Sequence, residues 1–122
     1  MDASVLLAVE FAEPTADSAV AALEAYREGL VMSTVNLAEV LIRVGDRRPD
    51  AVAGLADRLQ RSEIRFSAPD PFQARTAARA RLRFPLNLGD CFAYALATAE
   101  DCPILTLDRD FLRTDRPVVI PA

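Results

Sequence analysis

Short apolar runs alternate along the chain with longer segments in which apolar residues recur every three or four positions. The recurring spacing predicts one-sided helices, and the short runs predict buried strands. Helices are expected over residues 14–27, 35–44, 50–61, 69–83 and 90–100, with a further apolar segment over residues 3–11. Strands are expected over residues 30–32, 64–66, 104–107 and 118–120. This alternation predicts a three-layer α/β/α domain with a mostly parallel central sheet.

Proline, glycine and hydroxyl residues mark the ends of these segments. Pro14 opens the second apolar segment and Gly29 closes it, while Ser33 or Thr34 is suited to cap the next helix. The polar run over residues 45–49 predicts a turn. Because the sequence has no internal repeat, linker or low-complexity stretch, the whole chain from 1 to 122 is expected to form one domain.

The composition narrows the chemistry that such a domain can carry out. The 122 residues include 18 acidic and 14 basic side chains, and every basic side chain is arginine, with no lysine, histidine or tryptophan. Without histidine there is no Ser-His-Asp or Cys-His pair and no imidazole ligand for zinc. Without lysine there is neither a Schiff base nor a Walker-type phosphate loop. An enzyme of this composition has to use carboxylates, hydroxyls, thiols, arginines or a metal ion.

The cysteines and the net charge bear on location and partners. Cys91 and Cys102 are too few for a disulfide framework and are expected to be reduced thiols in the cytoplasm. No apolar run approaches the roughly 20 residues of a membrane span, and the first residues lack the pattern of a secretory signal. The net charge of −4 argues against a simple basic coat for nucleic acid, but not against a nuclease with local arginine patches.

Four acidic residues stand out because of what surrounds them. Asp2 directly precedes the first apolar segment, Asp90 begins the most apolar helix, and Asp108 follows a predicted strand. Glu39 lies inside the apolar helix over residues 35–44. Strand ends and helix starts meet along one edge of a parallel sheet, so these carboxylates are expected to converge there. Converging anions favour a hard divalent cation such as Mg²⁺ or Mn²⁺, and Ca²⁺ stays open on ligand chemistry alone.

Each of these acids also has a purely structural interpretation. Asp90 is a suitable helix N-cap, Asp2 can be an exposed terminal residue, and Asp108 can form a turn with Asp110. Glu39 is the hardest to explain in this way, because a lone glutamate in so apolar a helix is rarely unpaired. Taken jointly, in a chain without histidine or lysine, the four residues favour a carboxylate metal site.

Four segments around these acids follow one another across the whole chain: DASVLLA (2–8), STVNLAEVL (33–41), LNLGDCFAYALA (86–97) and PILTLDRDF (103–111). This set resembles the PIN-domain nucleases, and specifically the VapC toxins of VapBC toxin–antitoxin systems. The third segment is the most specific of the four. The resemblance covers the full length of the chain and keeps the order of the family.

The resemblance implies an endoribonuclease that depends on Mg²⁺ or Mn²⁺, is held inactive by a cognate antitoxin and forms a homodimer. Its hydrolysis of RNA would leave a 5′-phosphate and a 3′-hydroxyl. The residues that match the catalytic and metal-binding acids of the family are Asp2, Glu39, Asp90 and Asp108, with Asp110 as the alternative to the last. The residues that match its assisting hydroxyl positions are Ser4 and Thr106.

The start of the chain departs from the family pattern. Only Met1 precedes the first aspartate, whereas the family has an apolar strand there. Either the natural chain starts further upstream or this first strand is short or missing. A terminus without a strand behind it is expected to fray, which would disturb the placement of Asp2.

An arginine stripe is the most evident candidate for binding nucleic acid. Arg75, Arg79 and Arg83 recur at every fourth position of one predicted helix and are suited to RNA phosphates, although a solvated helix face gives the same pattern. Two other functions stay open: a DNA- or structure-specific nuclease of the same fold, and a non-catalytic PIN-like interaction module. Side-by-side cleavage of RNA and DNA distinguishes a DNA-directed nuclease from a ribonuclease. Thermal stabilisation by Mn²⁺ distinguishes a nuclease with an intact metal site from a non-catalytic module.

Overall fold

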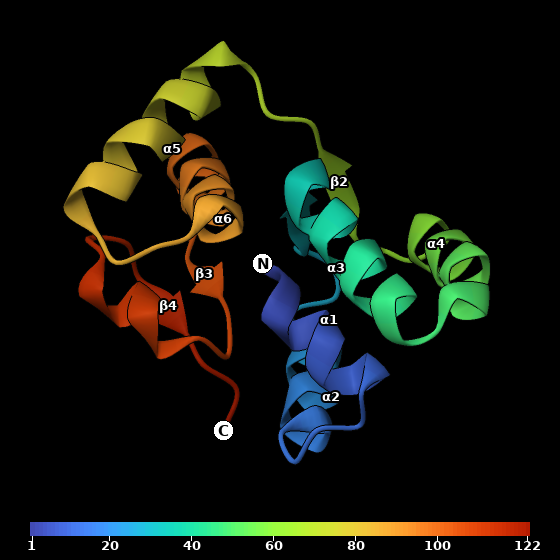
Figure 1. Ribbon diagram of the computed structural model, residues 1–122. Coiled ribbons are helices and arrows are strands. Elements are labelled where there is room, and N and C mark those ends of the chain that lie inside the picture. The colour runs from blue at the N-terminus through green and yellow to red at the C-terminus, as the bar shows by residue number, and fades with distance from the viewer.

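The computed structural model describes residues 1–122 and consists of two halves that meet near the N-terminus (Figure 1). The first half contains the helices α1 (Ala3–Glu10), α2 (Ala16–Ala25), α3 (Thr34–Arg47) and α4 (Val52–Gln60), with a 3₁₀ turn η1 (Pro49–Ala51) before the last. It also contains the strands β1 (Val31–Ser33) and β2 (Arg65–Ser67). The second half contains α5 (Pro71–Arg83), α6 (Leu88–Glu100), β3 (Ile104–Leu105), the 3₁₀ helix η2 (Arg109–Arg113) and β4 (Val118–Val119).

The strands form two parallel pairs, one in each half. In the first pair, β1 lies beside β2, with Met32 opposite Phe66; in the second, β3 lies beside β4, with Ile104 opposite Val118. The prediction of an α/β fold with parallel strands is therefore confirmed. The first element of the chain is helix α1.

The first two residues join the two strand pairs. The terminal ammonium of Met1 donates a hydrogen bond to the carbonyl oxygen of Val31 in β1 at 2.9 Å. The backbone N–H of Asp2 donates to the carbonyl oxygen of Leu105 in β3 at 3.2 Å. The beginning of the chain thus lies between the halves, in an extended conformation, and α1 starts from there (Figure 1).

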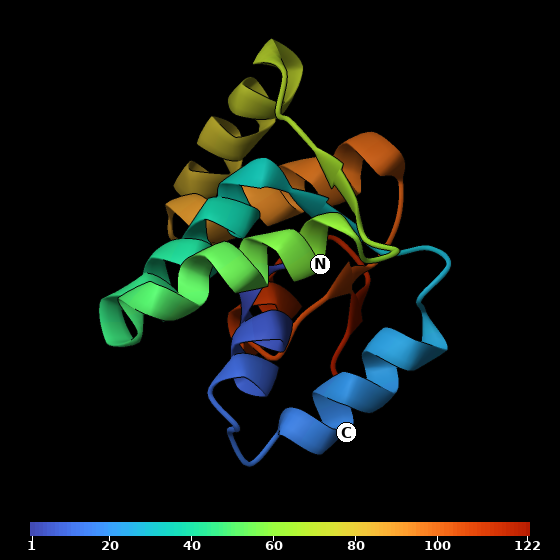
Figure 2. The same ribbon diagram turned by 90° about the vertical axis from the view of Figure 1, so that its right-hand side faces the viewer.

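The molecule has two hydrophobic cores, one centred in each half, and Leu105 of β3 packs into the first of them. In the first, Val40 and Val44 are spaced by four residues on α3, so they lie on one helix face and are buried against Met32 of β1. In the second, Phe111 of η2 is fully buried with Ile104 of β3. Helix α3 contacts α6 where the halves meet, while α2 and α5 lie at opposite ends of the molecule (Figure 2). No helix has both the length and the apolar composition needed to cross a membrane.

Several predicted boundaries were wrong by a few residues. Helix α3 continues through Gly45, so the turn predicted at this glycine is wrong. The N–H of Arg48 still bonds to the carbonyl oxygen of Val44, and the helix ends only before Pro49, which disfavours helical geometry in the residue before it. Helix α6 begins at Leu88, two residues before the predicted start, because an earlier residue supplies the cap.

Candidate functional site

Asp2 is the most deeply buried of the predicted acids. Only 4% of its surface is exposed, so both the expectation of a frayed terminus and the interpretation as a surface residue are wrong. It is the N-cap of α1, and its Oδ1 accepts hydrogen bonds from the backbone N–H of Ser4 at 3.2 Å and from the Ser4 hydroxyl at 2.7 Å. The backbone bonds of Met1 and Asp2 to the two strand pairs hold this carboxylate in place.

Two hydroxyl groups connect Asp2 to the segment that follows β3. The Oγ of Ser4 lies 3.3 Å from Oγ1 of Thr106 and accepts the backbone N–H of Leu107 at 2.9 Å. The Oγ1 of Thr106 in turn accepts the backbone N–H of Asp108 at 2.9 Å. The hydroxyls therefore fix the start of α1 relative to the loop that carries Asp108.

Asp90 lies in the first turn of α6 and takes part in a capping box. Its Oδ2 accepts the backbone N–H of Asn87 at 3.2 Å, while the side chain of Asn87 accepts the N–H of Asp90 at 2.9 Å. The sequence suggested Asp90 as the N-cap of this helix, but the N-cap is Asn87. Asp90 contributes to capping from the third helical position instead. The capping box also orients the carboxylate, since it occupies one oxygen and leaves the other without a hydrogen bond.

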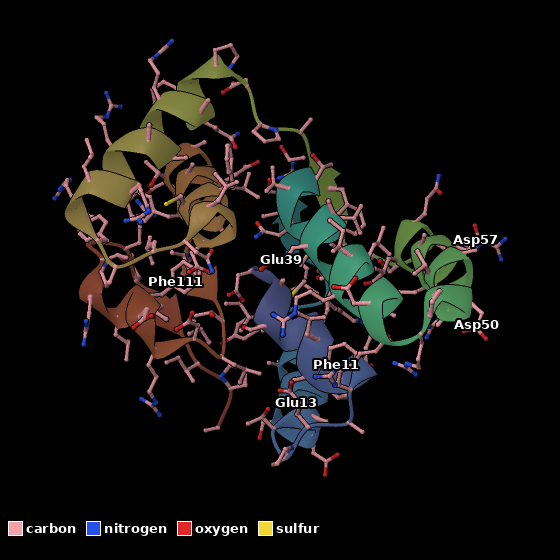
Figure 3. The ribbon with its side chains drawn as sticks, viewed as in Figure 1. Phe11, Glu13, Glu39, Asp50, Asp57 and Phe111 are labelled. Carbon is pink, nitrogen blue, oxygen red and sulfur yellow. The ribbon has the colours of Figure 1, made fainter.

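Glu39 projects from α3 on the side that faces the start of the chain and α6 (Figure 3). The side-chain amide of Asn36, one turn earlier, donates to its Oε1 at 3.4 Å. The carboxylate lies against Gly89 so closely that a Cβ there would be 2.8 Å from Oε1. Asn36 and Gly89 were not among the residues predicted for the site, although the i, i+3 spacing to Glu39 and the position next to Asp90 were visible in the sequence.

Asp108 is partly buried and begins η2. Its Oδ1 accepts the backbone N–H of Asp110 at 2.9 Å, so the predicted turn between these two residues is present. The Asp110 side chain is exposed. The turn presents Asp108 beside Ser4 in a polar depression that Arg43 also lines.

Burial and hydrogen bonding shift the acidity of Asp2. Burial raises the pKa of its carboxyl from 3.8 to about 6, and the neighbouring hydroxyl groups of Ser4 and Thr106 offset part of that rise. The negative charge of Asp90 raises the pKa further. The carboxylates of Asp2 and Asp90, which come from different halves of the molecule, are thus close enough to repel one another.

Asp90 has a raised pKa for similar reasons. Burial is the largest cause and brings the pKa of this carboxyl from 3.8 to about 6, while the N–H of Asn87 acts in the opposite direction. Further increases come from the negative charges of Asp108, Glu39 and Asp110. All the predicted acids therefore act on Asp90 or Asp2 electrostatically.

The carboxylates have no cationic side chain as partner. None of the 14 arginines forms an ion pair with any of them, since the five ion pairs of the molecule lie elsewhere. The hydrogen bonds that Asp2, Glu39, Asp90 and Asp108 accept all fall on one oxygen of each carboxylate. The second oxygen of each accepts none within 3.5 Å, and oxygen ligands of this kind suit a hard divalent cation.

The predicted convergence is nevertheless incomplete. No three acidic or cysteine side chains lie close enough together to coordinate one ion. The four acids form a cluster of mutually repelling charges at the junction of the halves and not a closed set of ligands. The donor chemistry, carboxylate oxygens without a cationic partner, fits a hard divalent cation.

Comparison with known proteins identifies the family of the chain. The family model of the PIN domain matches residues 1–117. The chain belongs to the PIN-domain family. Nearly the whole chain is included, so both halves and all of the acids described above lie within this PIN domain.

Curated relatives show which branch of the PIN-domain family this is. The chain is 36% identical to Ribonuclease VapC36 of Mycobacterium tuberculosis over 125 residues, which cover 94% of the chain and 88% of that protein. It is 34% identical to Ribonuclease VapC30 of the same organism over 123 residues, with 94% and 93% covered. These identities place the PIN domain among the VapC proteins.

A solved structure has the same fold. A chain of a toxin–antitoxin complex from Klebsiella pneumoniae matches with a TM-score of 0.77, covering 99% of this chain and 95% of the other. The sequence identity is 21%, so this likeness bears on the fold alone. The overall arrangement of helices and strands is therefore also found in a solved structure.

The arginine stripe lies on the outer surface of this PIN domain. Arg75, Arg79 and Arg83 are exposed on α5, and α6 lies between α5 and α3 (Figure 1). The guanidinium of Arg83 is 4.9 Å from the centre of the Phe84 ring and 3.9 Å from a carboxylate oxygen of Asp115. The structure does not bring the stripe into contact with the acidic cluster.

Proposed function

We propose that this PIN domain is a divalent-metal-dependent endoribonuclease, the toxin component of a toxin–antitoxin system. The observation that carries the proposal is the acidic cluster at the junction of the halves, which 14 arginines leave without an ion pair. Buried carboxylates of like charge cost stability unless a cation accompanies them. The relatives that carry the name ribonuclease support the reaction, and the solved toxin–antitoxin complex with the same fold supports the biological setting.

The residues proposed to hold Mg²⁺ or Mn²⁺ are Asp2, Glu39, Asp90 and Asp108, with Asp110 as the alternative to the last. Such an ion, when bound, lowers the pKa of a coordinated water and stabilises negative charge on a phosphodiester. The chain itself positions the carboxylates: Ser4 orients Asp2 through two bonds to Oδ1, and the N–H of Asn87 orients Asp90 through Oδ2. In each case the other oxygen stays available to the ion.

Thr106 has a connecting role in this proposal. Its hydroxyl lies between Ser4 and the backbone of Asp108, so it fixes the distance between acids that come from opposite halves. Because neither hydroxyl is charged, the pair can position Asp2 and the backbone of Asp108 without repelling a cation at the site. We propose that Ser4 and Thr106 keep Asp2 and Asp108 at a fixed distance from each other while RNA binds.

Arginines outside the cluster are proposed to bind the RNA backbone. Arg43 lines the polar depression beside Asp108 and is the nearest candidate for the phosphate next to the cleaved bond. Arg75, Arg79 and Arg83 are proposed to contact phosphates further along the strand, across α6 from the acids. Their charges also serve to attract RNA to a chain whose net charge is −4.

The proposed partners are a cognate antitoxin and a second copy of the chain. Support for the antitoxin comes from the toxin–antitoxin complex with the same fold. Large apolar side chains are exposed on several helices, and a homodimer or an antitoxin would cover part of them. The most exposed are Leu82, Leu88 and Ile42. We also propose a cytoplasmic location, where RNA is available and the free thiols of Cys91 and Cys102 stay reduced.

The decisive test is the variant Asp90→Asn, assayed side by side on RNA and on DNA of the same sequence. It is expected to lower the rate of RNA cleavage by at least about 100-fold, because the charge that holds the ion is removed while the capping oxygen remains. The variant Asp50→Asn changes an exposed acid on the far side of the molecule and is the matched control (Figure 3). Full cleavage by the Asp90 variant, or cleavage of DNA alone by the unmodified chain, would overturn the proposal.

A further inference from the structure

Asn36 is a polar residue in a fully buried position beside the acidic cluster. None of its surface is exposed, and it lies one helical turn before Glu39 on α3, so both side chains lie on the same face of that helix. That face contacts α6, the helix that carries Asp90. Asn36 is therefore enclosed at the point where the two halves of the molecule meet.

The side-chain amide of Asn36 contacts both helices. Its Nδ2 donates a hydrogen bond to the backbone carbonyl oxygen of Gly89 at 3.0 Å and a longer one to Oε1 of Glu39 at 3.4 Å. Gly89 directly precedes Asp90 in the first turn of α6. One amide group thus connects the carboxylate of Glu39 with the peptide that carries Asp90.

Gly89 also limits the position of the same carboxylate. A Cβ at this position would lie 2.8 Å from Oε1 of Glu39 and 3.2 Å from its Cδ, closer than side chains approach one another. The φ angle of Gly89 is an ordinary helical one, so alanine would suit the backbone. A side chain at this position would therefore displace the Glu39 carboxylate, although the backbone conformation itself does not call for glycine.

Asn36 is a poor choice if stability alone is considered. Its Oδ1 is buried and has no hydrogen-bond partner, which costs free energy that a wholly apolar side chain would not cost. Leucine has the same number of side-chain heavy atoms and a better helix propensity. Buried polar groups that cost stability are typical of functional sites, where position matters more than packing.

We propose that Asn36 is a positioning residue that, together with Gly89, holds the carboxylate of Glu39 against the first turn of α6. The amide donates to Oε1 and leaves Oε2 without a hydrogen bond, and the absent Cβ of Gly89 provides the space. This inference rests on the proposed function, because the position of Glu39 matters only if the carboxylate binds an ion. Asn36 acts through Glu39 and does not itself contact the reacting groups.

The test compares four variants for Mn²⁺ binding and RNA cleavage. Asn36→Leu removes the donor, and Gly89→Ala displaces the same carboxylate by its added methyl group while favouring the helix. Gln73→Leu is the matched control, because Gln73 is another buried amide with an unpartnered oxygen, on α5. Glu39→Gln is the reference for loss of the ligand itself. Mn²⁺ affinity is read from the Mn²⁺ concentration that gives half of the full increase in Tm.

We expect Asn36→Leu and Gly89→Ala to raise the half-saturating Mn²⁺ concentration and to lower kcat by about 10–100-fold each, with KM for RNA changed by less than about 3-fold. Gln73→Leu should change neither quantity. Combining Asn36→Leu with Glu39→Gln should weaken Mn²⁺ binding no further than Glu39→Gln alone, because the amide acts through that carboxylate.

The outcomes separate this inference from the proposed function. If Glu39→Gln loses Mn²⁺ affinity while both Asn36→Leu and Gly89→Ala keep wild-type affinity and kcat, the positioning role is wrong and the metal site stands. If Glu39→Gln and Asp90→Asn also keep wild-type cleavage, the proposed function fails. If Asn36→Leu does not fold, Gly89→Ala decides alone. A wild-type half-saturating Mn²⁺ concentration in Gly89→Ala would show that the position of the Glu39 carboxylate against Gly89 does not matter for ion binding.

Discussion

Replacing Asp2 by asparagine should stabilise the metal-free protein at neutral pH although it removes a residue of the proposed site. The side chain keeps its shape, and its oxygen can still accept the hydrogen bonds of Ser4. What is lost is a negative charge in a position that is 4% exposed, beside the like charge of Asp90. Stability and activity are therefore expected to change in opposite directions.

The magnitude follows from the pKa of Asp2, which rises from 3.8 to about 6 on folding, mainly through burial. Because the native state then binds the proton more tightly than the unfolded state, stability falls as the pH rises from about 4 to about 6 and stays lowered above that range. A difference of about 2 pKa units corresponds to about 3 kcal/mol. Allowing for imperfect placement of the amide, Asp2→Asn should gain about 1–3 kcal/mol at pH 7.5, or roughly 4–12 °C in Tm.

The assay is thermal unfolding in EDTA from pH 4 to pH 8, repeated at pH 7.5 with increasing Mn²⁺. The decline in Tm between pH 4 and pH 6 should be smaller in Asp2→Asn, and not absent, because the pKa of Asp90 is also raised to about 6. Mn²⁺ should raise the Tm of the unmodified protein by mass action and have little effect on the variant. The exposed acid variant Asp50→Asn is the control and should shift stability by less than about 0.5 kcal/mol.

Two results would refute the reasoning on Asp2. If Asp2→Asn is less stable than the unmodified protein at pH 7.5 in EDTA, burial of the charge is not what determines its effect on stability. If the variant shows the same decline in Tm between pH 4 and pH 6, Asp2 does not titrate in that range. In either case the carboxylate lies in a more polar environment than its burial indicates.

Two further predictions concern RNA binding and the core of the second half. Replacing Arg75, Arg79 and Arg83 together by alanine should weaken RNA binding and leave kcat unchanged. The slope of log K against log salt concentration, measured by fluorescence anisotropy, should decrease in magnitude by about 2 to 3. An unchanged slope would show that the stripe is only a solvated helix face. Phe111→Ala should cost about 3–5 kcal/mol in urea unfolding, because the ring is fully buried next to β3. The control Phe72→Ala removes a half-exposed ring and should cost less than about 1 kcal/mol; equal losses in the two variants would contradict the assignment of the core.

Local patterns in the sequence were sufficient to predict most of the helices and strands. Apolar spacing located all of the long helices, and the parallel arrangement followed from their alternation with strands. The ends were predicted less well, because caps depend on particular hydrogen bonds: Asn87 and not Asp90 caps α6, and Gly45 stays helical until Pro49 ends the helix. Periodicity reports which face is buried, not where the last hydrogen bond forms.

The acids of the candidate site could be identified from their apolar neighbours, but their relations to one another could not. The burial of Asp2 was contrary to expectation. Its position depends on the backbone hydrogen bonds of Met1 and Asp2, whose partners are about 30 and 100 positions away in the chain. The contacts of Asn36 with Gly89 likewise depend on two helices that are distant in sequence. No local pattern indicates such partners.

The sequence by itself limited the available chemistry: with arginine as its only basic residue and no histidine, the chain is left with carboxylates, hydroxyls, thiols, arginines or a metal ion, and apolar surroundings singled out four carboxylates as candidates. Only the tertiary structure decided how those carboxylates act together. Packing of α3 against α6, and the extended start of the chain between β1 and β3, bring acids from both halves into one electrostatic cluster. The physical reason is that charge and hydropathy belong to single residues, whereas repulsion, burial and raised pKa values depend on distances that folding alone establishes.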